Sequence, residues 1–342
     1  MTKAINVGIV GTGLYFPQPI MTAGDIAYAT KGLWTEHAII EKLGIYKKHV
    51  PGPEDGTQEM GVKAGLDCLK NTGVDPREID LILCIGEEWK EYPLTMSGTY
   101  IQHKIGAVNA WVIDVQQRCC TCISAMKMAK DMMIADPDIN TVMIVGGYRN
   151  SDFVNFEDPT HSIFFNLGAG AGAMIMKKNY NRNLLLGTHL MSDGSFARDT
   201  GVEFGGTANP ITHENVDVAY KSIRMFDEKH MKDGLNRVSM PNWFHCIDKA
   251  LEKSGLTRKD LGYLAILHFK YSMHKYMLQE LGLNENQTIY LSSYGHIGQV
   301  DQILSLQLAL EQDKVKDGTI LSMIAAGTGY TWAANVVKWG PM

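Results

Sequence analysis

Two segments of the chain, residues 141–147 (TVMIVGG) and 320–327 (ILSMIAAG), have too few polar positions for a strand with one face in water. Such runs are typical of central strands that helices cover on both faces. Residues 64–85 and 246–267 each combine a helical spacing of apolar positions, a glycine, a polar turn and a strand-length apolar run. The pattern therefore predicts an α/β protein whose central sheets are covered by helices.

The same units occur twice along the chain. Residues 64–85 (AGLDCLKNTGVDPREIDLILCI) resemble residues 246–267 (CIDKALEKSGLTRKDLGYLAIL), with Gly73 and Gly255 at an offset of 182 positions. Residues 122–147 resemble residues 302–327 in the same way. We therefore expect two similar α/β halves, residues 1–178 and 179–342. A functional site is expected where the halves meet, at loops that follow strands, because strand ends and helix starts supply N–H groups and fixed side chains there.

Composition narrows the classes of function. The chain has 342 residues, of which 45% are hydrophobic and 20% are charged, and its net charge is −5. The chain lacks the basic excess of a nucleic-acid-binding protein, and it has no run of the about 20 apolar residues that a membrane span needs. We therefore expect neither a nucleic-acid partner nor a membrane protein. The opening of the chain lacks the pattern of a secretion signal. We expect a cytoplasmic protein with reduced cysteines.

Three of the six cysteines fall within four positions, at Cys119, Cys120 and Cys122. Zinc usually needs two separated pairs of ligands, and the only comparable pair, His245 and Cys246, is followed by no second C-x-x-C. Cys119 and Cys122 have the spacing of a redox pair, but no thioredoxin-like βαβ pattern surrounds them. We therefore expect no metal site here and disfavour a disulfide.

The residues around the cysteines suggest a third interpretation. Residues 109–114 (NAWVID) read as a strand, and the helix that follows has one apolar face, made of Ile123, Met126, Ala129 and Met133. Cys119 then lies at a strand-to-helix turn, where a helix N-terminus favours a thiolate and its N–H groups can hold an oxyanion. The alternative, that all three cysteines are small core residues, stays open at this point.

Eight segments occur in the order, and near the spacing, that a known family shows. They are VGIVGTGLYFPQPIMT, LGIYKKHV, IDVQQRCC, FNLGAGAGA, THLMSDGS, LHFKYSMHKYMLQELGL, SSYGHIGQVDQ and AAGTGYTWAANVVKW. From end to end the chain resembles the 3-oxoacyl-(acyl carrier protein) synthase III family of the thiolase superfamily. The resemblance implies a thiolase-like fold of two duplicated α/β halves in αβαβα layers.

The resemblance also assigns roles to residues. It implies that Cys119 is the nucleophile and that His268 is the catalytic histidine, while His296 occupies the place of the family's asparagine. Cys119, His268 and His296 resemble the trio of the chain-elongating ketosynthases, in which two imidazole N–H donors bind a thioester oxygen. Alternatively, one neutral imidazole serves as a general base. Asp301, five residues after His296, can orient a histidine or cap a helix.

Three further positions follow from the family motifs. Gly327 and Thr328 lie in the glycine-rich ending, where they would support the oxyanion; Thr328 replaces a glycine, so a required positive φ there would be strained. Glu88 resembles the acidic residue of 3-hydroxy-3-methylglutaryl-CoA synthase, which would favour an aldol-type addition. The neighbouring charges favour an exposed loop for Glu88 instead.

Substrates and partners are also implied by the resemblance. We expect coenzyme A or acyl carrier protein thioesters as substrates, with no cofactor, in fatty acid or polyketide biosynthesis. The family's grip on coenzyme A is not clearly kept, but Lys42 and Lys270 are candidates for it. Tyr92 aligns with an aromatic residue that reaches the acyl pocket of the partner in a dimer. We expect a homodimer, with further partner subunits as an open alternative.

The leading functional hypothesis is a ping-pong acyltransferase. An acyl thioester acylates Cys119, and a second substrate then takes the acyl group. The first choice for this second step is decarboxylative Claisen condensation to a 3-oxoacyl product. Acyl transfer to an oxygen or nitrogen acceptor is the second hypothesis, and the aldol-type condensation is the third. A non-catalytic scaffold subunit of a thiolase-type complex is the alternative outside enzymology.

Overall fold

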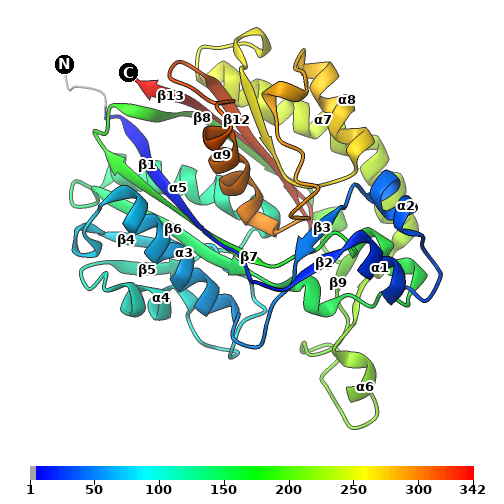
Figure 1. Cartoon of the computed structure of the whole chain (residues 1–342). Coiled ribbons are helices and arrows are strands. Elements are labelled where there is room, and N and C mark those ends of the chain that lie inside the picture. Colours follow the sequence, from blue (N-terminus) through cyan, green and yellow to red (C-terminus); the bar gives the residue numbers. More distant parts are fainter. Residues whose placement is uncertain (1–4) are drawn as a thin grey trace.

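The structure is a computed structural model that describes residues 5–342, and it has the α/β architecture that the apolar pattern predicts (Figure 1). The strands are β1 (Val7–Tyr15), β2 (Ile20–Thr22), β3 (Lys47–His49), β4 (Leu81–Cys84), β5 (Trp111–Asp114), β6 (Thr141–Tyr148), β7 (Gly170–Lys178), β8 (Arg182–Ser192), β9 (Thr200–Val202), β10 (Ile223–Met225), β11 (Tyr263–Ile266), β12 (Ile320–Gly327) and β13 (Thr331–Pro341). The α-helices are α1 (Ala23–Ala29), α2 (Glu36–Ala38), α3 (Thr57–Thr72), α4 (Ser97–Ile105), α5 (Thr121–Ala135), α6 (Val216–Ala219), α7 (Glu228–Lys253), α8 (Tyr271–Leu281) and α9 (Asp301–Glu311). Three short helical turns matter for the site: η1 (Ile39–Leu43), η3 (Arg118–Cys120) and η9 (Gly298–Val300).

Nine strands form one continuous sheet in the order β11-β12-β13-β8-β1-β7-β6-β4-β5. The expectation of two central sheets needs one amendment, because Gly8 of β1 pairs with Leu184 of β8 and joins them. Strands β1 and β4–β7 come from residues 1–178, and β8 and β11–β13 from residues 179–342. The boundary between the halves at residue 178 stays a prediction. Strand β7 ends at Lys178, and β8 begins at Arg182.

The helices lie in layers around this sheet. Helices α3 and α4 pack on first-half strands, and α7 packs on β8, β12 and β13. Helices α5 and α9 contact strands from both halves and form the central layer (Figure 1). The thiolase-like layering expected from the resemblance is confirmed.

The central position of α5 explains its apolar face. Ile123, Met126, Ala129 and Met133 are fully buried, as the helical spacing predicts. Helix α9 is buried as well, and it carries polar residues at Asp301, Gln302 and Ser305 into the interior. Buried polar groups need hydrogen-bond partners, so the start of α9 is a place to look for a site. No helix among residues 5–342 combines the length and the apolar character that crossing a membrane requires.

Candidate active site at the start of the two central helices

The candidate site forms where the two central helices begin. Helix α5 follows the turn η3, and α9 follows the turn η9, so equivalent elements of the two halves meet. The two turns are in contact with each other. Cys119 lies in η3, His296 lies two residues before η9, and Asp301 is the first residue of α9. The duplicated pattern thus brings residues 177 positions apart into one place.

Cys119, His296 and Asp301 form a continuous line of contacts. The Cys119 Sγ lies 3.1 Å from His296 Nε2. On the other side of the ring, His296 Nδ1 lies 2.6 Å from Asp301 Oδ2. Asp301 is 0% exposed, and its other oxygen accepts the Ile297 N–H at 2.7 Å. A buried carboxylate held in this way fixes the orientation and the tautomer of the imidazole.

Neighbouring charges determine the pKa of the His296 ring. Burial lowers the pKa of its ring, but the charges of Cys119 and Asp301, together with their hydrogen bonds, raise the pKa well above the ordinary value for histidine. The raising effects win because both neighbours of the ring favour its protonated form. His296 is therefore suited to accept a proton from the Cys119 thiol.

His268 lies beside this line but does not join it through its ring. Its backbone N–H donates to Asp301 Oδ2 at 2.8 Å. Its Nε2 lies 3.1 Å from the Gly44 carbonyl and its Nδ1 lies 3.2 Å from the Asn166 side-chain amide. The carbonyl can only accept, so the proton belongs on Nε2 and Nδ1 accepts from Asn166. Burial lowers the pKa of His268 to about 4, which keeps this ring neutral at pH 7.

The expected Cys-His-His trio is therefore only partly assembled. Among residues 5–342, no hydrogen bond joins His268 to Cys119, and both of its ring nitrogens are engaged elsewhere. His268 instead supports Asp301 through its backbone. The Asp301 side chain reaches the ring of His296 as well as the backbone N–H of Ile297, so it makes more contacts than a helix cap alone would.

Gly327 closes the site from the second half. A Cβ atom at Gly327 would lie 3.2 Å from the Cys119 backbone nitrogen and 2.9 Å from the Gln117 carbonyl oxygen. The Cys120 N–H donates to that carbonyl at 3.2 Å, whereas the Cys119 N–H donates to no backbone acceptor within residues 5–342. The Cys119 N–H is thus free for an oxyanion. Thr328 is exposed and has no positive φ, so the strain expected there is absent among the described residues; Gly329 carries the positive φ of 128°.

The other cysteines near the site are core residues. Cys120 and Cys122 are fully buried, and the Cys120 Sγ contacts the Thr331 carbonyl at 3.4 Å. Burial raises the pKa of Cys122 to about 12 and that of Cys120 well above its ordinary value. Cys119 alone of the three is partly exposed. Residues 5–342 contain no group of three or more histidine, cysteine or acidic side chains arranged to hold a metal ion.

Comparisons with known proteins give the family. The model of 3-oxoacyl-[acyl-carrier-protein (ACP)] synthase III matches residues 113–194, and the model of the C-terminal part of the same synthase matches residues 251–339. The β-ketoacyl-[acyl-carrier-protein] synthase III of Caldanaerobacter subterraneus is 25% identical over 342 residues, which cover 99% of each chain. The chain belongs to the 3-oxoacyl-(acyl carrier protein) synthase III-like family of the thiolase superfamily.

Solved structures agree on the fold of this synthase III-like protein. The β-ketoacyl-[acyl carrier protein] synthase III of Thermus thermophilus has a TM-score of 0.83 at 20% identity and covers 98% of this chain and 100% of its own. The priming β-ketosynthase of the R1128 polyketide pathway has a TM-score of 0.82 at 22% identity. The match covers 98% of this chain and 97% of the ketosynthase. The relatives place this synthase III-like protein among the condensing transferases.

The acidic pair after β4 consists of one exposed and one buried carboxylate, and the exposed loop favoured for Glu88 agrees with the structure. Glu88 is exposed and forms an ion pair with Arg118 at 3.0 Å, while its neighbour Glu87 is 3% exposed and lies 3.2 Å from the same guanidinium. Burial raises the pKa of Glu87, although Arg118 and Asn150 oppose that shift. The buried carboxylate beside the nucleophile turn is therefore Glu87 and not Glu88. The sequence does not show which of two adjacent glutamates is buried. The path of the backbone after β4 decides this, because it turns Glu87 into the interior and Glu88 toward solvent.

Sequence reasoning also missed Lys48 and Asn166. The fully buried Lys48 ammonium donates to the Phe165 and Leu167 carbonyls, at 2.7 Å each. Asn166, between them, accepts the His296 N–H at 2.7 Å through its own carbonyl. Burial lowers the pKa of Lys48 to about 7. The available signal was a lysine at the basic position of the LGIYKKHV motif.

The proposed substrate-binding residues lie at the surface. Lys42 is in η1 and Lys270 precedes α8, and both are exposed. Along the chain, Lys42 lies two residues before Gly44 and Lys270 two residues after His268, the two residues that contact each other. The two lysines thus flank the His268 side of the site. Tyr92 is exposed in the loop before α4.

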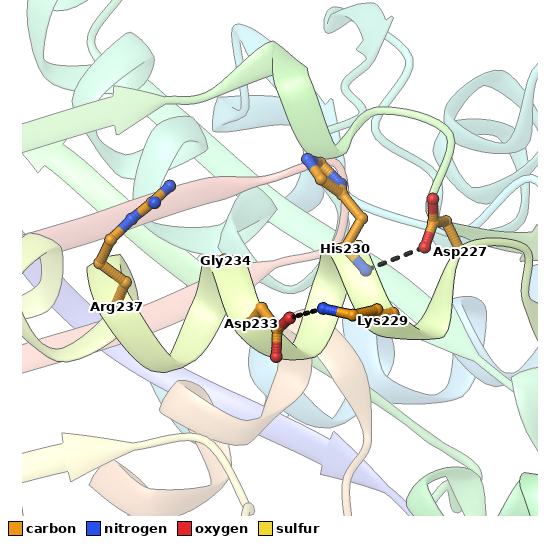
Figure 2. A pocket seen from close by; sticks show the side chains of 6 residues that line it. All are labelled: Asp227, Lys229, His230, Asp233, Gly234 and Arg237. Carbon is orange, nitrogen blue, oxygen red and sulfur yellow. Dashed lines mark hydrogen bonds and ion pairs between the residues drawn. The ribbon is translucent and has the colours of Figure 1, made fainter.

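An open pocket on the first turns of α7 contains none of the expected site residues (Figure 2). It is lined by Asp227, Lys229, His230, Asp233, Gly234 and Arg237. Lys229 and Asp233 form an ion pair along the helix, and the His230 N–H donates to the Asp227 cap at 2.9 Å. These pairs are ordinary features of a helix start, so the pocket does not change the assignment of the site.

Proposed function

We propose that this synthase III-like protein transfers an acyl group from a thioester of coenzyme A or acyl carrier protein, through Cys119, to a second substrate. The observation that carries the proposal is the line of contacts from Cys119 through His296 to Asp301. A nucleophile, a base and a group that orients the base stand within hydrogen-bond reach of one another, which is the arrangement that activates a thiol. The same line argues against a non-catalytic scaffold.

The first half-reaction follows from this geometry. His296 Nε2 takes the proton of the Cys119 thiol, and Asp301 stabilises the imidazolium that forms. The Cys119 Sγ attacks the thioester carbonyl, whose oxygen takes up negative charge beside the free Cys119 N–H and the Gly327 backbone. The tetrahedral intermediate collapses, the carrier thiolate leaves with the proton from His296, and the acyl group stays on Cys119.

The tautomer of His296 favours one kind of acceptor. After the first half-reaction the ring is neutral, and its remaining proton sits on Nδ1 because Asp301 can only accept it. Nε2 then faces the acyl group as a base. We propose an acceptor whose nucleophilic atom carries a removable proton, such as a hydroxyl, an amine or an acidic C–H group.

Decarboxylative Claisen condensation is the second candidate, and the names of the relatives favour it. Loss of carbon dioxide leaves an enolate that needs N–H donors. Neutral His296 offers no N–H donor at Nε2, and the ring Nε2–H of His268 already donates to the Gly44 carbonyl. The geometry thus ranks this candidate below a transfer in which the acceptor loses a proton.

The proposal is tested by acylation followed by mass spectrometry. We expect incubation with a panel of acyl-CoA and acyl-carrier thioesters to add acyl mass to the Cys119 peptide. The label should disappear in Cys119→Ser and persist in Cys120→Ser and Cys122→Ser, the matched controls. Label on another cysteine, or none from any donor of either class, refutes the proposal.

A second measurement distinguishes the two candidates for the later step. The acylated protein is offered malonyl-CoA carrying a labelled free carboxyl group, or hydroxyl and amine acceptors. Our ranking predicts loss of acyl from Cys119 to an acceptor without release of labelled carbon dioxide. Stoichiometric release of carbon dioxide together with a 3-oxoacyl product would reverse the ranking.

A further inference from the structure

The carboxyl ends of three parallel strands meet on one side of Cys119. Strands β5 and β6 both pair with β4 in parallel, so the segments after Cys84, Asp114 and Tyr148 emerge at the same edge. Contacts join these segments: the Gln116 amide donates to the Gly86 carbonyl, and Arg118 pairs with Glu87. We call this region the polar edge, and it consists of Glu87, Gln117, Tyr148, Asn150, Ser151 and Gln299.

Three hydrogen-bonding atoms of the polar edge have no partner among residues 5–342. They are Gln117 Oε1, Ser151 Oγ and Gln299 Oε1. Gln299 is 0% exposed, and its amide nitrogen donates to the Ile85 carbonyl at 2.5 Å, which fixes the amide so that Oε1 faces away from that carbonyl. Buried polar atoms normally find partners, so unpaired atoms on the segments that surround the nucleophile turn indicate a place for a polar ligand.

Glu87 and Tyr148 connect this edge to Cys119. Both side chains are buried. Burial raises the pKa of Tyr148, and the nearby negative charges of Cys119 and Glu87 raise it further. The Tyr148 ring also lies 6.1 Å from the ring of His296. A group bound on Cys119 therefore has the polar edge within reach.

We propose that the polar edge is the subsite for the acyl group, and that it takes a short acyl chain carrying a hydroxyl or amino donor. This inference rests on the proposed acylation of Cys119. The Glu87 carboxylate and the two glutamine oxygens are acceptors, so the complementary ligand supplies donors. A plain hydrocarbon tail would leave the two glutamine oxygens unpaired, and a site built to bond a hydroxyl strongly rejects the analogue that lacks it.

The order of contacts through the site supports the acyl group as occupant. From Cys119 the contacts run through His296 and Asp301 to His268, and the exposed Lys42 and Lys270 flank that end. Two exposed ammonium groups suit the phosphates of a carrier arm. A thioester that enters from the lysine side brings its acyl group to Cys119, and Glu87 is bound there by Arg118, the residue that precedes the nucleophile.

The test compares two probes that differ by one hydroxyl group, 3-hydroxybutyryl-CoA and butyryl-CoA, with octanoyl-CoA as the apolar probe. The rate of mass addition to Cys119 is measured for each, and the hydroxy-to-plain ratio is taken within each variant, so that a loss of folded protein cancels. We expect a ratio of about ten or more in the wild type, since one buried hydrogen bond is worth roughly a factor of ten. Gln299→Met and the milder Ser151→Ala should both bring the ratio toward one.

Gln302→Met is the matched control. Gln302 is also fully buried with an unpaired Oε1, but its amide donates to the Ile324 carbonyl on β12, away from the polar edge. Its substitution should keep the ratio. A wild-type preference for butyryl or octanoyl groups, or a ratio that both edge variants leave unchanged, overturns the subsite while Cys119 acylation stands. No label from any thioester defeats the proposed function itself, and the subsite with it.

Discussion

At the scale of single residues, Asp301 is the group on which the site depends. Its two oxygens accept the N–H groups of His268 and Ile297 and the ring proton of His296. One fully buried carboxylate thus joins two segments of the second half in one geometry. The three donors stabilise the buried negative charge of Asp301. Removing that charge, or one of its donors, leaves buried polar groups unpaired and destabilises the site.

Asp301→Asn should slow the acylation of Cys119 by about 10²–10⁴-fold, the usual contribution of a positioned base. The amide keeps the size of the side chain, but it cannot hold the imidazolium of His296 by charge. Quenched-flow acylation followed by mass spectrometry measures the rate. Asp131→Asn, the same change on the exposed ion-paired face of α5, is the control. A rate within threefold of the wild type would remove Asp301 from the relay.

His268 makes the stability of the protein depend on pH. Its pKa is lowered by burial to about 4 in the folded chain, while an unfolded histidine titrates near 6.5. Between these values the unfolded state binds more protons, so stability falls as the pH drops from about 6.5 to about 4, by on the order of 3 kcal/mol from this group. Urea unfolding at several pH values should therefore show a shallower acid loss in His268→Asn. Identical pH slopes in the two proteins would contradict the assignment.

At the scale of elements, the site depends on how closely β12 packs on the turn η3. Gly327→Ala would bring a methyl group to 2.9 Å from the Gln117 carbonyl oxygen and 3.2 Å from the Cys119 nitrogen. We expect a drop of about tenfold or more in Cys119 acylation, because displacement of this turn spoils an oxyanion site. Gly206→Ala, where a Cβ meets no atom within 4 Å, is the control. Equal losses in both variants would count against a local effect.

Strand β3 holds the segment that carries Asn166. Lys48→Met would leave the Phe165 and Leu167 carbonyls without their shared donor, at a cost of about 1–3 kcal/mol for each buried group left unpaired. The Asn166 carbonyl would then hold the His296 N–H less firmly. We predict slower acylation at unchanged affinity for the thioester, together with lower stability.

Lys48→Arg supplies the control for this prediction, since it keeps a cation with several donors. It should recover most of the acylation rate that Lys48→Met loses. If the arginine variant is as slow as the methionine variant, the role of Lys48 is packing and not the placement of the Asn166 segment.

At the scale of the whole molecule, β5 is an edge strand of the nine-stranded sheet. Its first residue, Trp111, is exposed, and so are Tyr92, Leu94 and Met96 in the loop before α4. An unpaired edge beside apolar side chains is a surface that proteins cover. We propose that a second copy covers it by two-fold symmetry. Light scattering at micromolar concentration should give a dimer mass that Trp111→Lys reduces. Met273→Lys, at an exposed position of α8, should leave the mass unchanged. A wild-type monomer would refute the dimer.

The sequence by itself determined the architecture. Apolar runs such as residues 141–147 and the repeated helix–turn–strand unit specify buried strands and duplicated halves, because side-chain periodicity follows directly from local backbone geometry. Cys119 was also within reach of sequence reasoning, since a strand, a turn and an apolar helix place it at a helix start.

Only the tertiary structure decided how the polar groups around that cysteine are partnered. Nothing local distinguishes His268 from His296, or Glu87 from Glu88, yet one histidine contacts the Cys119 Sγ while the other meets the Gly44 carbonyl. The partners come from segments up to 224 positions apart and converge only after both halves have packed. Burial and hydrogen-bond direction, which set the tautomers and the charges, are properties of that packing and are not encoded at any one position in the sequence.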